Sequence, residues 1–329
     1  MENIKNCPIC ESTEQTVFLK SRNFRVNAEK FDVMECNSCT FRYTSPLPSM
    51  TEIGEYYDPQ NYVSHTGTKK GLINKLFHSA RFFTLRNKYK LLSKVSKGKR
   101  HLDIGAGNGV FLSFMQEKGW DVSGVELDDA SRARIVENTG LPIAKFVQDN
   151  SETEEYDVIT MWHVLEHVYE LKKDIKTIKE KLKKNGALIV AVPNCASYDA
   201  KKYKEFWAAY DLPIHLYHFR PQNIKDLFAQ YNMEVVETKP MKFDSFYISL
   251  ISEKYKNNQK GGLGAMIKGF WFGLISNLKA KNGEYSSQIY VIKNKCQQWH
   301  NESLGGSEMV KHVSPSCLGS SPISGGKPH

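Results

Sequence analysis

Short apolar runs alternate with segments of helical periodicity from Arg100 to about residue 295. The apolar runs have the length of buried strands and lie at 101–104, 122–125, 156–162, 187–192, 233–237 and 286–293. The other segments repeat apolar residues at helical spacing and lie at 110–116, 130–137, 171–183 and 221–231. This alternation predicts an α/β fold in which helices cover both faces of a parallel sheet.

The rest of the chain differs in pattern. Residues 1–60 hold short alternating stretches between turn residues, which is typical of a small β-rich module. Residues 61–98 form a basic amphipathic connector, with a helix expected from 71 to 95. Residues 99–295 carry the α/β pattern. Residues 296–329 are rich in serine, glycine and proline, and we expect them to be a disordered tail outside the fold.

Composition and charge exclude several classes of protein. Of 329 residues, 40% are hydrophobic and 25% charged, which excludes a disordered chain, a collagen and a coiled coil. No apolar run is long enough to span a membrane, and the first residues show no secretory signal. We therefore expect a cytoplasmic protein with reduced cysteines.

The net charge of +9 gathers in two segments. Residues 51–100 carry eleven basic and three acidic side chains, and residues 251–300 carry eight and two. Such surfaces attract nucleic acid, anionic membranes or anionic substrates, or they are solvated helix faces. The basic-flanked apolar stretches 72–95 and 267–279 could lie on an anionic bilayer. The alternative that we favour is that both stretches pack over the sheet or line the pocket.

A glycine-rich loop stands where the strand at 101–104 meets the helix at 110–116. It reads L-D-I-G-A-G-N-G at 102–109. Glycines let the backbone approach a ligand, and the helix N-terminus presents free N–H groups. Glu126 follows at the end of the next strand, where a carboxylate can bind both hydroxyls of a ribose.

The residues around this loop discriminate between two ligands. A dinucleotide fingerprint needs a glycine at position 110, which is Val110, and Asp103 would repel a pyrophosphate. S-adenosylmethionine carries an ammonium, a sulfonium and a ribose but no phosphate. Asp103 and Glu126 therefore favour S-adenosylmethionine over a dinucleotide. A tight turn that binds nothing is the remaining alternative.

Three sequence blocks resemble class I S-adenosylmethionine-dependent methyltransferases over about residues 99–295. They are L-D-I-G-A-G-N-G at 102–109, V-E-L-D at 125–128 and Y-D-V-I-T-M-W-H-V-L-E-H-V at 156–168. The last resembles the small-molecule branch that includes ubiquinone-biosynthesis O-methyltransferases. The resemblance implies a Rossmann-like, seven-stranded, mostly parallel sheet with an antiparallel last strand. It also implies methyl transfer to a sugar, a quinone or a lipid-linked metabolite.

The resemblance also implies where the cofactor lies. The loop and Asp103 would line its methionine part, Glu126 its ribose, Asp149 its adenine amine, and Trp162 would lie beside it. The implied cofactor-binding set is Asp103, Gly105, Ala106, Gly107, Asn108, Gly109, Glu126, Asp149 and Trp162.

His163, Glu166 and His167 follow the strand at 156–162, and in a helix they would share one face. Equivalent residues in the ubiquinone-type branch are associated with a divalent cation beside the substrate. Here His163 replaces a carboxylate, which weakens binding of Mg²⁺. A histidine general base and residues that only brace the helix are the alternatives. We expect His163, and His215 in a later aromatic segment, to be catalytic.

Two C-x₂-C pairs stand in the first forty residues, formed by Cys7 with Cys10 and by Cys36 with Cys39. Four thiolates in tetrahedral geometry favour zinc, with iron as the minor alternative. Because no coordination position stays open, we expect a structural site. A zinc-ribbon-like head before a catalytic domain also resembles many bacterial methyltransferases.

Three functions remain open at this point. The first is methyl transfer to a small-molecule acceptor. The second is RNA methylation, in which the head and the basic stretch 69–100 grip phosphates. The third is a binding module that keeps only the fold. The strand at 156–162 is not followed by the N-P-P-Y or D-P-P-Y type of sequence, and no RNA-module signature occurs. We therefore expect a small-molecule acceptor rather than nucleic acid, and the oligomeric state stays open.

Overall fold

The protein is described from a computed structural model, at residues 1–57, 72–150, 155–258 and 262–295. For residues 72–82 and for Lys281 only the backbone is described. The predicted tail at 296–329 and the first residues of the predicted connector, 61–71, lie outside the described residues.

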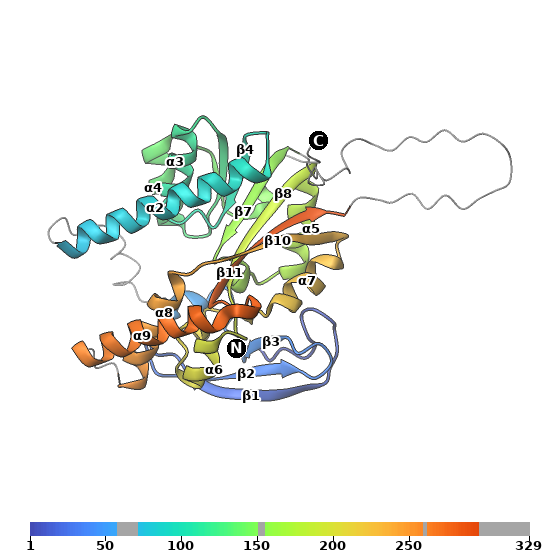
Figure 1. Ribbon diagram of the computed structural model, residues 1–329. Helices are drawn as coiled ribbons and strands as arrows, with labels where there is room; N and C mark the ends of the chain where they lie inside the picture. Colours follow the sequence, from blue (N-terminus) through green and yellow to red (C-terminus); the bar gives the residue numbers. More distant parts are fainter. Residues whose placement is uncertain (58–71, 151–154, 259–261, 296–329) are drawn as a thin grey trace, which may run out of the picture. The chain divides into compact units, whose positions relative to one another are not determined.

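A seven-stranded sheet forms the centre of the α/β part, with the strand order β10-β11-β8-β7-β4-β5-β6 (Figure 1). Its strands are β4 (Arg100–Ile104), β5 (Asp121–Val125), β6 (Ile143–Ala144), β7 (Tyr156–Trp162), β8 (Leu182–Pro193), β10 (Met233–Pro240) and β11 (Ser287–Asn294). Strands β4 to β8 pair in parallel, whereas β11 is antiparallel to both of its neighbours. The predicted fold class and the antiparallel last strand are confirmed.

Helices lie between the strands. They are α2 (Leu72–Val95), α3 (Val110–Glu117), α4 (Asp129–Thr139), α5 (Leu171–Lys181), α6 (Tyr198–Tyr203), α7 (Pro221–Ala229), α8 (Asp244–Lys256) and α9 (Leu263–Lys279). Short 3-10 turns are η1 (Ile53–Tyr56), η2 (Val147–Asp149), η3 (Leu165–His167), η4 (Lys204–Phe206), η5 (Ala208–Tyr210) and η6 (Ala280–Asn282). Within the described residues, none of these helices could cross a membrane.

The sheet has a hydrophobic core on each face. Along β8, Leu188 and Val190 belong to one core, and Ala187 and Ile189 belong to the other. Because successive side chains of a strand point to opposite faces, a strand covered on both sides is continuously apolar. This explains why the apolar runs predicted the strands well.

Two of the differences between the structure and the predicted elements have a clear physical reason. The helix predicted at 171–183 ends at Lys181, because Leu182 already pairs with Tyr156 at the start of β8. Helix α8 is not predicted by the sequence pattern. Its buried face holds small residues, Ser245, Ser249 and Ser252, so the helical repeat of large apolar residues is missing.

The N-terminal head contains a second, antiparallel sheet of β1 (Gln15–Arg22), β2 (Lys30–Cys36) and β3 (Arg42–Ser45). The prediction of a β-rich head is therefore confirmed. Its fourth strand, β9 (Tyr217–His218), comes from the α/β part and pairs with β3. The domain boundaries inferred from the sequence stay a prediction, but the head sheet is completed by residues far along the chain.

Candidate functional site

The glycine loop joins β4 to α3 at the carboxyl edge of the sheet. Gly105, Gly107 and Gly109 have φ values of 73°, 59° and 72°, a left-handed backbone that favours glycine. The N–H groups of Gly105 and Ala106 both donate to the carbonyl of Val125, at 2.8 and 3.0 Å. These bonds hold the start of the loop against the end of β5.

The loop is tight at one glycine and open at the next. A Cβ at Gly105 would lie 2.3 Å from Cγ2 of Val164. A Cβ at Gly107 would meet nothing within 4 Å among the described residues. Asn108 is also exposed, and its Oδ1 accepts the Val110 N–H at 3.4 Å. Space for a ligand therefore lies over Gly107 and Asn108.

Asp103 is buried at the end of β4, with 3% of its surface exposed. Its Oδ1 accepts a hydrogen bond from Oγ1 of Thr160 at 2.5 Å. Burial raises the pKa of Asp103 to about 7, although Thr160 and the nearby Lys88 oppose the shift. A bound cation would favour its ionised form.

Glu126 is buried at the end of β5, beside the open glycine. Its carboxylate accepts the N–H of Gly107 at 2.6 Å and that of Asp128 at 2.9 Å. Burial raises the pKa of Glu126 above its ordinary value, while these N–H groups oppose the shift. Asp149, expected near adenine, lies exposed in η2, where one oxygen accepts the Phe146 N–H at 3.1 Å.

Lys88 of α2 lies close to Asp103 and was not anticipated from the sequence. Its Nζ is 4.1 Å from the ring centroid of Trp162 and 5.0 Å from that of Phe111. Burial lowers the pKa of Lys88 to about 8, and the charges of Asp103 and Asp244 oppose that shift. One lysine among many on a basic helix gives no sequence signal of this position.

A cavity of about 370 Å³ opens beside Trp162. Its walls are largely apolar and include Phe83 of α2 and Phe243 before α8. Three lysines also line it, namely Lys88, Lys239 and Lys242. The size and the mixed lining suit a small-molecule ligand.

His163 follows β7 with a φ of 57°, an uncommon value for a non-glycine residue. Its Nδ1 lies 3.3 Å from Oε1 of Glu166, and its Nε2 lies 3.1 Å from Oδ2 of Asp244. Burial alone would lower the pKa of His163, but the two carboxylates outweigh burial and raise it to about 10. His163 therefore holds its proton at neutral pH.

Glu166, His167 and His215 form a second cluster, whose ligand atoms lie within 4.8 Å of one another. Nδ1 of His167 donates to the carbonyl of Ile214 at 3.0 Å, and Nδ1 of His215 donates to that of Ala209 at 2.9 Å. These bonds leave each Nε2 as an acceptor. Oε2 of Glu166 is buried and has no hydrogen-bond partner among the described residues.

This cluster fits a transition metal better than Mg²⁺. Two imidazoles and one carboxylate suit zinc, iron or manganese, whereas Mg²⁺ prefers oxygen ligands. Carbonyls that fix the histidine tautomers are usual around such ions. The segment is not the regular helix considered above, because only η3 is helical and His163 precedes it. His163 contacts Asp244 as well as Glu166.

The four head cysteines come together. The Sγ atoms of Cys7 and Cys39 lie 3.5 Å apart, as do those of Cys10 and Cys36, and all four lie within 4.8 Å of one another. Zn–S bonds of about 2.3 Å in a tetrahedron place sulfurs about 3.8 Å apart. The residues therefore fit a four-thiolate ion, and no disulfide joins them.

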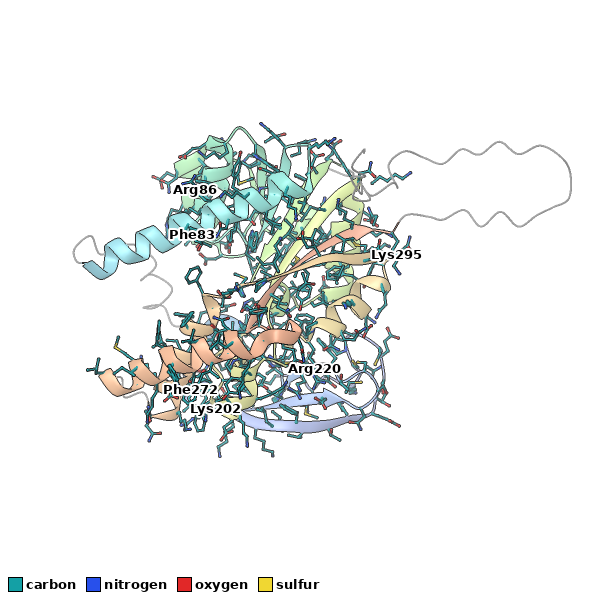
Figure 2. The ribbon with its side chains drawn as sticks, in the orientation of Figure 1. Phe83, Arg86, Lys202, Arg220, Phe272 and Lys295 are labelled. Carbon is teal, nitrogen blue, oxygen red and sulfur yellow. The ribbon has the colours of Figure 1, made fainter. Side chains whose placement is uncertain are left out.

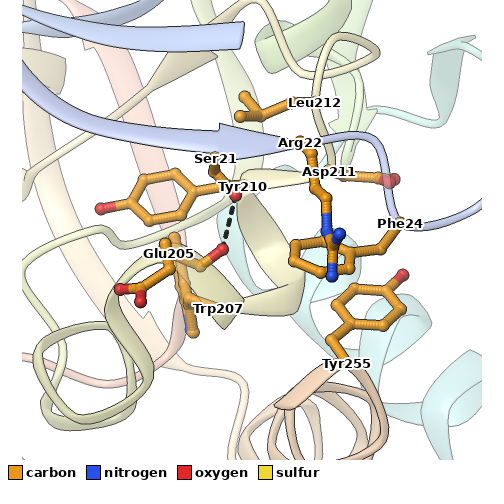
Figure 3. A pocket seen from close by; sticks show the side chains of 9 residues that line it. All are labelled: Ser21, Arg22, Phe24, Glu205, Trp207, Tyr210, Asp211, Leu212 and Tyr255. Carbon is orange, nitrogen blue, oxygen red and sulfur yellow. Dashed lines mark hydrogen bonds between the residues drawn. The ribbon is translucent and has the colours of Figure 1, made fainter. Parts of the chain in front are cut away.

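A second, smaller crevice lies between β1 and residues 205–212 (Figure 3). Oγ of Ser21 donates to the carbonyl of Glu205 at 2.5 Å across it, and Phe24 stacks on Tyr255 with ring centroids 4.6 Å apart. The crevice contains none of the predicted site residues. We interpret it as part of the contact surface between the head and the α/β part.

Comparison with known proteins gives consistent results for the α/β part. Residues 77–238 match a family described as "Methyltransferase domain". The ubiquinone biosynthesis O-methyltransferase of Pasteurella multocida (strain Pm70) is 30% identical over 114 residues, covering 30% of this chain and 47% of that protein. Its namesake from Actinobacillus pleuropneumoniae serotype 7 (strain AP76) is 33% identical over 110 residues, with the same coverage.

The chain thus spans about half the length of the curated relatives it matches. Among solved structures, a SAM-dependent methyltransferase from Archaeoglobus fulgidus is 16% identical. The aligned region covers 68% of this chain and 98% of the Archaeoglobus fulgidus chain, with a TM-score of 0.45. The family match, the relatives and the sheet order lead to one assignment: the chain carries a class I S-adenosylmethionine-dependent methyltransferase domain.

Proposed function

We propose that the protein transfers the methyl group of S-adenosylmethionine to a small-molecule acceptor. One observation carries the proposal. Two buried carboxylates, Asp103 and Glu126, stand at the ends of the adjacent parallel strands β4 and β5, and Glu126 accepts the N–H of the open Gly107. A cationic nucleoside without phosphate satisfies both of them, whereas a pyrophosphate would be repelled.

Each residue of the cofactor set then has a role. Asp103 would bind the ammonium group, and the backbone from Gly105 to Gly109 would line the methionine part. Glu126 would exchange its bond to Gly107 for the ribose hydroxyls, and Asp149 would bind the adenine amine. The cofactor itself supplies the electrophilic methyl group and its leaving group. The protein has to orient the acceptor and remove its proton.

The cavity beside Trp162 is the proposed acceptor site. Its apolar walls favour a hydrophobic acceptor body. Lys88 and Lys242 line it together with Lys239, which pairs with Glu237 at 2.7 Å, and the Asp244 carboxylate is paired with His163. The surplus of positive charge favours an acceptor with an anionic group.

His215 is the better candidate for the proton acceptor. Burial lowers the pKa of His215, so the imidazole is neutral at physiological pH, and its Nε2 can accept a proton as long as no metal ion occupies the cluster. His163, held between Glu166 and Asp244, would instead donate a hydrogen bond that orients the acceptor. The four head cysteines would hold a structural zinc ion, which fits their spacing and sulfur chemistry.

Methyl transfer from tritium-labelled S-adenosylmethionine tests this function. Acceptors should be offered as matched pairs of phenols with an apolar chain, with and without a carboxylate. We expect label in the carboxylate-bearing member, and we expect Lys242→Gln to reduce the difference within a pair. Labelling of transfer RNA in place of every small molecule would contradict the proposal.

A further inference from the structure

Helix α9 exposes its apolar side. Leu263, Met266, Ile267, Phe270 and Trp271 follow one another at the i, i+3, i+4, i+7 and i+8 positions of a helix face. Their exposed fractions are 75%, 60%, 61%, 58% and 58%. Such a stripe normally faces a protein core. Here it faces outward along most of the helix.

The opposite side of α9 is the one that packs. A Cβ at Gly269 would lie 2.7 Å from Cα of Leu250, and one at Gly273 would lie 2.7 Å from Cα of Phe246. Phe272 packs edge-on against Tyr203 at 6.1 Å, and Nζ of Lys202 lies 4.6 Å from its ring centroid (Figure 2 labels Phe272 and Lys202). Small residues therefore dock α9 closely on α8, and the large side chains are left outside.

The apolar surface extends from α9 to the mouth of the acceptor cavity. The Phe246 and Phe270 rings lie 4.9 Å apart. Phe243, Tyr247 and Phe83 are 66%, 64% and 53% exposed. The Phe243 and Phe83 rings meet edge-on at 6.2 Å, and both residues also line the cavity. An exposed apolar surface of this extent marks an interaction site.

The charges around this surface have one sign. The exposed charged residues within 241–258 and 262–279 are lysines: Lys242, Lys254, Lys256, Lys268 and Lys279. Two acids occur in the same ranges. Glu253 is buried, and Asp244 is paired with His163. The surface is thus apolar with a positive border, which complements an anionic partner.

We propose that this α8–α9 surface binds the face of an anionic lipid bilayer. An amphipathic helix with large apolar residues and flanking lysines lies in the membrane interface and is attracted by anionic headgroups. Aromatic residues such as Trp271 and Tyr247 favour that interface. The helix would lie on the bilayer rather than cross it.

Other occupants match the surface less well. A two-fold contact between copies of this chain would place lysines against lysines and repel. Nucleic acid would pair with the lysines, but Leu263, Met266 and Ile267 offer it neither stacking nor hydrogen bonds. A bilayer accommodates both the aliphatic stripe and the positive border. If the proposed methyl transfer is correct, the neighbouring cavity could receive an amphiphilic acceptor directly from the membrane.

Vesicle co-sedimentation of the full chain tests the inference, with phosphatidylglycerol–phosphatidylcholine vesicles and with pure phosphatidylcholine. We expect binding to the anionic vesicles that weakens with salt. The double variant I267S/W271S should lower the partition coefficient at least about tenfold, because it removes two of the five large apolar side chains of the stripe. K268E/K279E should lower it by about fivefold or more for each lysine.

Matched variants on the head control for general surface effects. Val17 is 46% exposed and Lys20 is also exposed, both on β1. V17S and K20E should bind vesicles as the parent protein does. Binding of S-adenosylhomocysteine should be equal in all variants, which shows that they are folded and keeps this test separate from that of the methyl transfer.

Three results would overturn the inference. The parent protein could stay in the supernatant with anionic vesicles at low salt. I267S/W271S could bind them as tightly as the parent. Sedimentation equilibrium could show a dimer that the same substitutions dissociate, in which case the occupant is a second copy of the chain.

Discussion

Gly107 and Gly105 offer a paired test of the cofactor loop, because they share a left-handed backbone but differ in their surroundings. Alanine in that conformation costs about 1–2 kcal/mol at either position. At Gly105 the new methyl group also lies 2.3 Å from Val164, and overpacking adds about 1–3 kcal/mol. At Gly107 the new methyl group meets nothing within 4 Å among the described residues.

The two variants should therefore fail in different ways. Gly105→Ala should lower the free energy of unfolding by about 2–5 kcal/mol in urea titrations. Gly107→Ala should lose only about 1–2 kcal/mol of stability. Its methyl group would fill the space reserved for the cofactor, so its affinity for S-adenosylhomocysteine should fall at least about tenfold, or 1.4 kcal/mol. Calorimetry that finds parental affinity in Gly107→Ala would refute the position of the cofactor.

Three further predictions concern ionisable and metal-binding groups. The pKa of Asp103 is about 7 in the free protein, and an ammonium group binds the ionised carboxylate. The affinity for S-adenosylhomocysteine should therefore rise up to about tenfold per pH unit between pH 5.5 and 7 and then level off. A similar pH dependence in Asp103→Asn would contradict this prediction. Elemental analysis of the parent protein should find one zinc ion per chain at the head cysteines. The ion should be lost in Cys39→Ser and retained in the control variant Cys195→Ser. A parent protein without zinc, or a Cys39→Ser variant that retains it, would refute the structural site. Cobalt added to the zinc-loaded protein should bind the cluster of Glu166, His167 and His215 and give a visible absorption spectrum without thiolate bands. His215→Gln should abolish this spectrum. The same cobalt spectrum in His215→Gln as in the parent protein would exclude His215 as a ligand.

The centre of the sheet could be predicted from the sequence because strands such as β7 and β8 are buried on both faces. Apolar runs such as β7 and β8 then stand out along the chain. The position of the glycine loop could also be predicted, because the loop and the strand ends beside it are local in sequence, whereas its part in cofactor binding stays a prediction. Helix α8 could not, since it packs through serines where large apolar residues would otherwise show the repeat.

The acceptor side was only partly predictable, because its residues come from distant segments. Lys88 reaches Trp162 from α2, and Asp244 reaches His163 from α8. Neither contact leaves a local pattern. The same holds for the cluster of Glu166 and His215, which the sequence separates by nearly fifty residues. Burial alone would favour a neutral His163, but its two carboxylate partners, one of them from the distant α8, outweigh burial and keep it protonated.

Competition calorimetry between S-adenosylhomocysteine and NAD tests the central claim most directly. The two buried carboxylates should select a nucleoside that carries an ammonium group and no phosphate, so we expect S-adenosylhomocysteine to bind with one site per chain and NAD not to displace it. Asp103→Ala and Glu126→Ala should each weaken that binding by about 1–3 kcal/mol, the cost of an unpaired buried polar partner. Tight binding of NAD, with S-adenosylhomocysteine unable to compete, would contradict the account.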